Sequence, residues 1–175
     1  MTCVITGDII NSRSDTANSW IPLLKTILNQ YGTSPKDWEI FRGDSFQIEL
    51  KRASEALLFA IKVKAILKTI KKVDVRLGIG IGTKNFVTDT ITEANGEAFI
   101  NSGYAFDHLL KKQNIAIKTP WKDFDDTYNT SLGLALLIMD NWTVSSSEFI
   151  SMYLNNPNLT QKIISKQLQI SESSA

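Results

Sequence analysis

The sequence has very little cysteine and histidine. A single cysteine, Cys3, excludes an intrachain disulfide, and with the single histidine, His108, it excludes a zinc site built from these residue types within one chain. No apolar run is long enough to span a bilayer, and the N-terminus lacks the basic segment of a signal peptide. The net charge of +1 gives no overall attraction to nucleic acid, which would need a local patch. We therefore expect a cytoplasmic protein without membrane association.

Residues 38–50 organise the rest of the chain. Phe46, Ile48 and Leu50 alternate with polar residues, as in a half-buried strand, and a second β-prone run precedes them. Gly43 as the first central residue favours a type II′ turn between the two strands. We expect a hairpin that presents the carboxylate of Asp44 at its tip.

The remaining N-terminal segments predict alternating strands and helices. Residues 3–10 are an apolar, β-branched run typical of a strand covered on both faces. Apolar residues recur at helical spacing over 19–31 and 96–112, and residues 114–118 suit a short peripheral strand. Residues 1–120 therefore predict an α+β domain, a ferredoxin-like β-α-β-β-α-β core with helices on an antiparallel sheet.

Two further segments carry specific expectations. Residues 53–71 predict a long helix with Leu57, Leu58, Ile61, Ala65 and Leu67 against the sheet and a solvated face of Lys64, Lys68, Lys71 and Lys72. Residues 75–82 alternate strictly, with Gly78, Gly80 and Gly82 on one face. A glycine stripe implies that something packs very close to the backbone, either the first helix or a ligand.

The C-terminal part predicts helices only. Residues 121–143 read as a connecting helix, and residues 144–175 as a partial helix-turn-helix whose first helix ends near Leu168. Ser171 would cap a recognition helix that begins where the sequence stops, as in a shortened chain. The alternative is an amphipathic helix with a disordered tail. The residues predicted to contact DNA are Thr160, Gln161, Ser171 and Ser173.

Two carboxylates form the candidate site. In a β-α-β-β order the first strand and the hairpin are neighbours, so Asp8 and Asp44 are expected side by side. Adjacent carboxylates repel, which raises the pKa of one unless a cation is present. Mg²⁺ or Mn²⁺ with a phosphate ligand would satisfy both. The alternative is a capped strand end beside an ordinary turn aspartate.

Several short motifs resemble nucleotide cyclases. Residues 4–9 (VITGDI) resemble the first metal-binding segment of class III cyclases, and residues 41–46 (FRGDSF) resemble their second metal-site hairpin and that of diguanylate cyclases. Residues 75–82 and 96–102 (GEAFINS) are similar to later cyclase segments. The resemblance implies metal ligation by Asp8, Asp44 and the Ile9 backbone, nucleotide or phosphate binding by Arg42, Gly43, Asn11 and Ser12, and a catalytic role for Asn101.

The departures from cyclases are equally specific. Ala105 stands where cyclases place an arginine that stabilises the transferring phosphates, and the loss of such a clamp lowers the rate by orders of magnitude. Ser45 follows Asp44 where diguanylate cyclases carry a second acid. Arg42 could instead pair with Glu39 or Glu49, Asn101 could cap or bridge, and His108 is expected at the surface. We therefore expect cyclase architecture with lapsed catalysis.

A closer resemblance is to the SatD family, through residues 4–13 (VITGDIINSR), residues 96–99 (GEAF) and the C-terminal helix-turn-helix pattern. It implies a cyclase-like domain coupled to a DNA-binding module. We therefore expect a bacterial transcriptional regulator whose degenerate cyclase-like domain senses a ligand, with a nucleotide as one candidate, or dimerises. A homodimer is expected. The alternatives are a metal-dependent nucleotidyl cyclase or transferase acting on ATP or GTP, and a domain kept for assembly alone.

Overall fold

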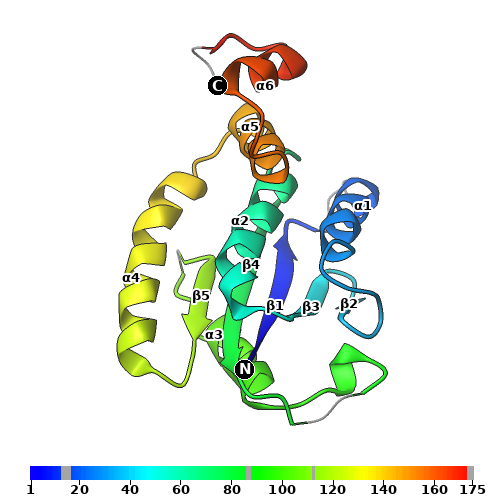
Figure 1. The fold of residues 1–175 in the computed structure, drawn as a ribbon, viewed down its shortest axis with the longest axis vertical. Helices are drawn as coiled ribbons and strands as arrows, with labels where there is room; N and C mark the ends of the chain where they lie inside the picture. The colour runs from blue at the N-terminus through cyan, green and yellow to red at the C-terminus, as the bar shows by residue number, and fades with distance from the viewer. Residues whose placement is uncertain (13–16, 86–87, 112, 173–175) are drawn as a thin grey trace.

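Five strands form one mixed sheet in the order β2-β3-β1-β4-β5 (Figure 1). The structure is a computed structural model that describes residues 1–12, 17–85, 88–111 and 113–172. The strands are β1 (Thr2–Ile10), β2 (Trp38–Phe41), β3 (Ser45–Leu50), β4 (Asp74–Gly82) and β5 (Ile115–Lys118). The helices are α1 (Ala17–Leu28), α2 (Ala56–Leu67), α3 (Glu97–Asp107), α4 (Lys122–Met139), α5 (Val144–Asn155) and α6 (Gln161–Leu168), with 3₁₀ turns at Ala53–Glu55 and Ile91–Glu93. The α+β class is confirmed.

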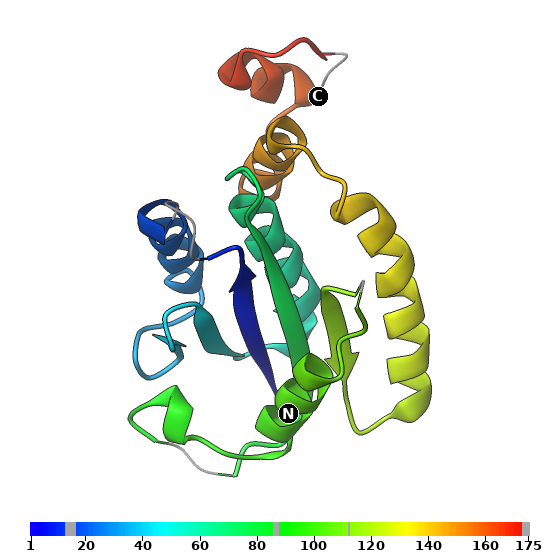
Figure 2. The same cartoon turned by 180° about the vertical axis from the view of Figure 1, so that it is seen from behind.

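The sequence predicted an antiparallel sheet, but the observed sheet is mixed. β1 pairs antiparallel with β3 and β4, and β2 pairs antiparallel with β3, but β5 lies parallel to β4. The chain passes from β4 through α3 before it returns as β5, and such a crossover brings the second strand back in the same direction. Figures 1 and 2 show α1 and α2 on one face and α3 on the other.

Both faces of β1 are buried, as its apolar run predicts. Cys3, Ile5 and Ile9 belong to the main core, whereas Val4 packs on the other face with α3 residues such as Phe99. The hairpin strand β3 buries Phe46, Ile48 and Leu50 and leaves the residues between them partly exposed. Period-two patterning therefore identified the buried positions of β3 correctly, and the apolar run identified β1 as a strand covered on both faces.

The glycine stripe of β4 faces α3. A Cβ atom on Gly80 would lie 2.1 Å from the backbone nitrogen of Ser102, and one on Gly78 would lie 2.4 Å from the Ser102 carbonyl oxygen. The sequence predicted a close neighbour but named the first helix or a ligand. That neighbour is α3, which packs directly on the strand backbone.

The hairpin turn differs from the predicted type II′. Arg42 and Gly43 both have positive φ, at 53° and 91°, which is the combination of a type I′ turn with Gly43 as its second central residue. Phe41 pairs with Ser45, so the loop contains three residues and the turn begins one residue earlier than expected. Asp44 is therefore the last residue of this loop and immediately precedes β3.

Helix α2 is shorter than predicted, and only part of its predicted apolar face is buried: Ala65 and Leu67 are buried and Ile61 packs against the core. It ends at Leu67, and Leu57 and Leu58 are 41% and 44% exposed rather than packed on the sheet. Lys64, predicted on a solvated face, is fully buried. Its Nζ lies 2.8 Å from Asp74 Oδ1 and 2.7 Å from Asp140 Oδ1, so two carboxylates from other elements balance its charge.

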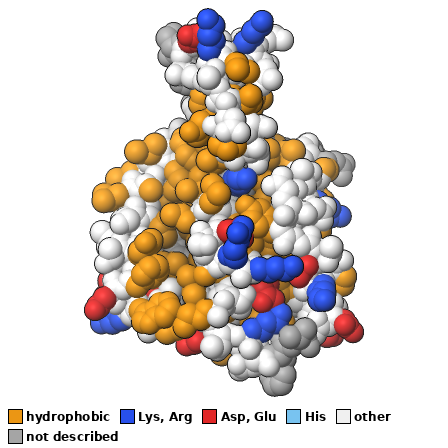
Figure 3. Space-filling view, in the orientation of Figure 1, with side chains coloured by type: hydrophobic (Ala, Val, Ile, Leu, Met, Phe, Trp, Pro, Cys, Tyr) orange, Lys and Arg blue, Asp and Glu red, His pale blue; other side chains and the backbone are white. Residues whose placement is uncertain are grey.

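The C-terminal helices extend from one end of the sheet. α4 runs along β5 and buries Leu132, Leu136 and Met139. α5 packs against α2 and carries α6 beyond the body of the molecule, where Figure 3 shows a narrow projection. Hydrophobic side chains gather below it over α2 and α4 (Figure 3). No helix in the described part of the chain is long and apolar enough to span a membrane.

Candidate functional site

A pocket of about 590 Å³ lies where β1 ends beside the hairpin. We call it the carboxylate pocket. Its lining residues are Asp8, Ile9, Ile10, Asn11, Ser12, Asp44, Arg76, Lys111 and Asn114. Five of them are residues that the sequence predicted for metal or phosphate binding. The structure therefore brings together Asp8, Ile9, Asn11, Ser12 and Asp44.

The strand register places the two carboxylates next to each other. Asp8 is paired with Ser45, the residue after Asp44, across the antiparallel β1–β3 ladder. The Ile9 amide donates a hydrogen bond to the Asp44 carbonyl at 3.1 Å, which fixes the hairpin loop against β1. The Ser12 hydroxyl donates to Asp44 Oδ2 at 2.5 Å, and Ser12 itself is only 8% exposed. The Asp44 side chain is therefore held in one orientation.

Asp8 is paired with Arg76, a residue that the sequence interpretation missed. The two residues are opposite each other in the β1–β4 ladder, and Arg76 binds the carboxylate with two nitrogens, with Nε donating to Oδ1 at 2.9 Å. This hydrogen bond raises the pKa of the Arg76 guanidinium, with added attraction from Asp44, while partial burial opposes the rise. Arg76 is the only charged residue in the predicted strand 75–82, which was the available signal.

The charges of the pocket balance. Asp8 and Asp44 are opposed by Arg76 and Lys111. Among the described residues no group of three or more His, Cys, Asp or Glu could hold a metal ion. Mg²⁺ requires six oxygen ligands and usually takes one or two carboxylates plus phosphate oxygens and waters. The residues therefore fit a cation shared with a phosphate ligand, and not a cation held by protein groups alone.

Three residues suggested by the cyclase resemblance lie outside this pocket. Arg42 and Gly43 are exposed in the hairpin loop, and neither Glu39 nor Glu49 forms an ion pair with Arg42 in the described structure. The Asn101 side chain donates to the Ile81 carbonyl at 2.8 Å. Ile81 is five residues along β4 from Arg76, about 16 Å at the usual strand rise, so Asn101 lies toward the opposite end of that strand.

A second pocket of about 570 Å³ adjoins the first. The two share Ile10, Asn11 and Asn114. Beyond these residues the second pocket is lined by Lys68, Ile70, Lys71, Lys72, Val73, Asp74, Asp140, Trp142, Thr143 and Val144, and we call it the Trp142 pocket. It reaches the segment that joins α4 to α5. The shared residues place the two pockets side by side between the hairpin and this connection.

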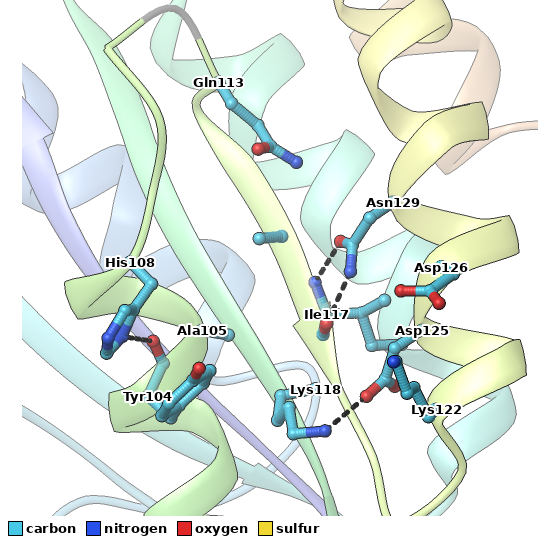
Figure 4. Close-up of a pocket in the computed structure, with 11 residues that line it drawn as sticks. Tyr104, Ala105, His108, Gln113, Ile117, Lys118, Lys122, Asp125, Asp126 and Asn129 are labelled. Carbon is cyan, nitrogen blue, oxygen red and sulfur yellow. Dashed lines mark hydrogen bonds and ion pairs between the residues drawn. The ribbon is translucent and has the colours of Figure 1, made fainter.

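Another pocket, of about 350 Å³, lies between α3, β5 and α4 (Figure 4). Two of its charged groups are paired with each other: Lys118 Nζ lies 2.6 Å from Asp125 Oδ2, and Asp125 also accepts two hydrogen bonds from Thr119. His108 is exposed, as predicted. Its ring stacks on Tyr104 with ring centroids 4.0 Å apart. None of the predicted binding residues lines this pocket, so we place the candidate site in the carboxylate pocket.

The C-terminal segment contains a well-formed helix end. Thr160 caps α6 by accepting from the Ile163 amide, and α6 ends at Leu168 as expected. Gln169 adopts a left-handed conformation with φ 57°, and the Ile170 amide donates to the Ser165 carbonyl at 3.0 Å, as in a Schellman motif. Gln161 Nε2 donates to the Glu172 carbonyl at 3.0 Å. Ser171 is exposed, and Ser173 lies outside the described residues.

The fold and the pocket thus define an α+β protein with C-terminal helices and a site that contains two carboxylates and two cationic side chains. Comparison with known families assigns it more closely. The family model described as SatD family matches residues 2–175, nearly the whole chain. The chain belongs to the SatD family. A search of curated proteins found no match.

Proposed function

We propose that this chain is a DNA-binding regulator that responds to a phosphorylated ligand. The ligand would bind together with a divalent cation in the carboxylate pocket, and the α5–α6 region would form part of a helix-turn-helix. The observation that carries this proposal is the meeting of Asp8 and Asp44 with Arg76 and Lys111 in one pocket. Carboxylates suit the cation, and guanidinium and ammonium groups suit phosphate oxygens.

The pairing of Asp8 with Arg76 balances both charges within the protein. Arg76 is about half exposed and can turn toward a phosphate, which leaves Asp8 available to the cation. The exchange keeps every charge compensated, because a phosphate replaces the carboxylate at Arg76 and the cation replaces Arg76 at Asp8. Ser12 keeps Asp44 oriented throughout.

A ferredoxin-like, cyclase-type assignment of the α+β part belongs to the same proposal. Its support is the element order β1-α1-β2-β3-α2-β4 together with the position of β1 between β3 and β4. β5 is then an addition at the edge of this core. A catalytic role has less support, because Asn101 points to a backbone carbonyl away from the pocket and Ala105 is buried.

DNA binding by the C-terminal helices is supported by backbone conformation and charge. A capped helix followed by a left-handed residue is the geometry in which a helix-turn-helix redirects the chain toward its recognition helix. Lys162 and Lys166 are exposed on α6, which contains no acidic residue. These lysines form the local positive patch that a chain of net charge +1 needs for DNA.

Thermal unfolding with nucleotides and Mg²⁺ tests the ligand site. At ligand concentrations about 100 times Kd, binding stabilises the folded state by about 2.7 kcal/mol, or about 5–11 °C in Tm for a chain of this size. We expect such a shift with Mg²⁺ and ATP or GTP in the wild type and its loss in Asp44→Asn. Asp107→Asn, an exposed change on α3, is the matched control. Absence of any shift at millimolar ligand overturns the sensing proposal.

The proposed DNA binding by α6 is tested by the salt dependence of binding to duplex DNA. If Lys162 and Lys166 contact phosphates, replacing both with glutamine reduces the slope of log K against log salt by about 2. Lys36→Gln, at an exposed loop position, serves as the control. Equal slopes for the wild type and the double variant would contradict the assignment of α6 to the DNA-binding surface.

The adjacency of Asp8 and Asp44 also favours one alternative, a metal-dependent nucleotidyl cyclase or transferase. Product formed from ATP or GTP with Mg²⁺ or Mn²⁺, and abolished in both Asp8→Ala and Asp44→Ala, would establish it. Unchanged nucleotide after prolonged incubation with a protein that binds it would favour the regulatory function.

A further inference from the structure

The two neighbouring pockets together offer room for a ligand larger than a phosphate group. The carboxylate pocket and the Trp142 pocket measure about 590 and 570 Å³ and share Ile10, Asn11 and Asn114 as their common wall. Each is within the size range of pockets that bind small molecules. A ligand with charged groups in the first would extend naturally into the second.

The walls of the Trp142 pocket suit a flat heterocycle. Its apolar lining includes Ile70, Val73, Val144 and the partly exposed ring of Trp142. The Asn114 side chain lies at the boundary with the carboxylate pocket and carries both donor and acceptor groups. An aromatic ring for stacking and an amide for edge recognition are the usual protein groups that bind a nucleobase.

The same pocket includes the start of the C-terminal helices. Trp142, Thr143 and Val144 connect α4 to α5, and Thr143 caps α5 by accepting from the Ser146 amide at 3.1 Å. Asn114 Nδ2 donates to Asp140 Oδ1 at 3.4 Å, and Asp140 also binds buried Lys64. A molecule that contacts Asn114 and Trp142 therefore contacts the segment that orients α5.

We propose that the ligand is a nucleotide whose base occupies the Trp142 pocket, beside the α4–α5 connection, while its phosphates occupy the carboxylate pocket. The base, rather than the phosphates, is then the part of the ligand that alters the C-terminal helices. This inference rests on the proposed function, since it names the ligand class and the route of regulation for the same site.

The test compares ATP and GTP with inorganic tripolyphosphate, all with Mg²⁺, by calorimetry on the full chain. Base stacking on an aromatic side chain adds a factor of about 5–150 in affinity. We expect at least one nucleotide to bind more tightly than tripolyphosphate by such a factor, and Trp142→Leu to remove that difference. Val144→Gln, which extends a 36% exposed side chain into the pocket, is a second variant expected to fold normally. Trp121→Leu, 49% exposed and not part of either pocket, is the control.

Hydrogen exchange of the α5 amides reports the regulatory step. We expect a nucleotide, but not tripolyphosphate, to change exchange within residues 144–155 of the wild type. If tripolyphosphate binds as tightly as both nucleotides and the Trp142 and Val144 variants bind like the wild type, the base site is wrong while the phosphate site stands. If neither tripolyphosphate nor nucleotides bind, the proposed function and this inference both fail.

Discussion

Replacing Lys64 with methionine tests the buried ion network that joins α2, β4 and the end of α4. Lys64 is completely buried, and its ammonium group contacts Asp74 and Asp140 at 2.7–3.1 Å. Methionine has a similar shape but leaves both carboxylates without this partner. Removing one member of a buried ion pair costs about 3–5 kcal/mol.

The remaining cation places the effect at the lower end of that range. Lys68 Nζ lies 3.2 Å from Asp74 Oδ2 and donates to the Asp140 carbonyl at 2.9 Å, so part of the negative charge stays compensated. We expect Lys64→Met to lower the free energy of unfolding by about 3 kcal/mol, which corresponds to about 6–12 °C in Tm.

Urea unfolding followed by circular dichroism measures the change, with Lys62→Met as the control on the same helix. Lys62 has no ion pair with any described residue, so its replacement should stay within about 0.5 kcal/mol of the wild type. Equal stability of the two variants would show that Lys64 is solvated, as its sequence spacing had suggested, and would refute the network.

Three further changes have effects that follow from local geometry. Gly80→Ala should destabilise the fold by about 3 kcal/mol or more, because the added Cβ would meet the Ser102 backbone. Gly103→Ala, where a Cβ has open space, should stabilise α3 by about 0.5–1 kcal/mol. Chemical denaturation measures both changes in stability. Thr160→Ala removes the α6 cap and should speed amide exchange in α6 about fivefold, as measured by NMR. Burial raises the pKa of the Cys3 thiol to about 12 from 9.0. The unfolded chain therefore loses this proton first, and the thiol's contribution to stability falls by about 1.4 kcal/mol per pH unit above pH 9; urea midpoints at pH 8 and 10 should show this fall in the wild type and not in Cys3→Ala.

The sequence predicted the local elements and the meeting of the two carboxylates. Alternation in β3 and the apolar run of β1 identify buried strands, and antiparallel pairing of neighbours brings the end of β1 to the hairpin. The closeness of Asp8 and Asp44 then follows from the order of the strands in the sheet. The glycines of β4 likewise predicted a close neighbour on that face, and the fold supplies α3 as that neighbour.

What the sequence missed depends on partners from distant segments. Lys64 follows a pattern of lysines that resembles a solvated face, and only the fold brings Asp74 and Asp140 to it. The pairing of Arg76 with Asp8 depends on the β1–β4 register, which local patterns do not specify. The Trp142 pocket forms where the α4–α5 connection passes the end of β1, an arrangement without a short sequence motif.

The central claim is that the carboxylate pocket binds a phosphate and a divalent cation together. The most direct measurement is calorimetric titration with Mg²⁺ alone, tripolyphosphate alone, and tripolyphosphate in the presence of Mg²⁺. Because the two carboxylates are balanced by Arg76 and Lys111, we expect each component alone to bind weakly and the two together to bind at least about tenfold more tightly. Tight binding of Mg²⁺ alone, or no binding of the combination at millimolar concentrations, would contradict the claim.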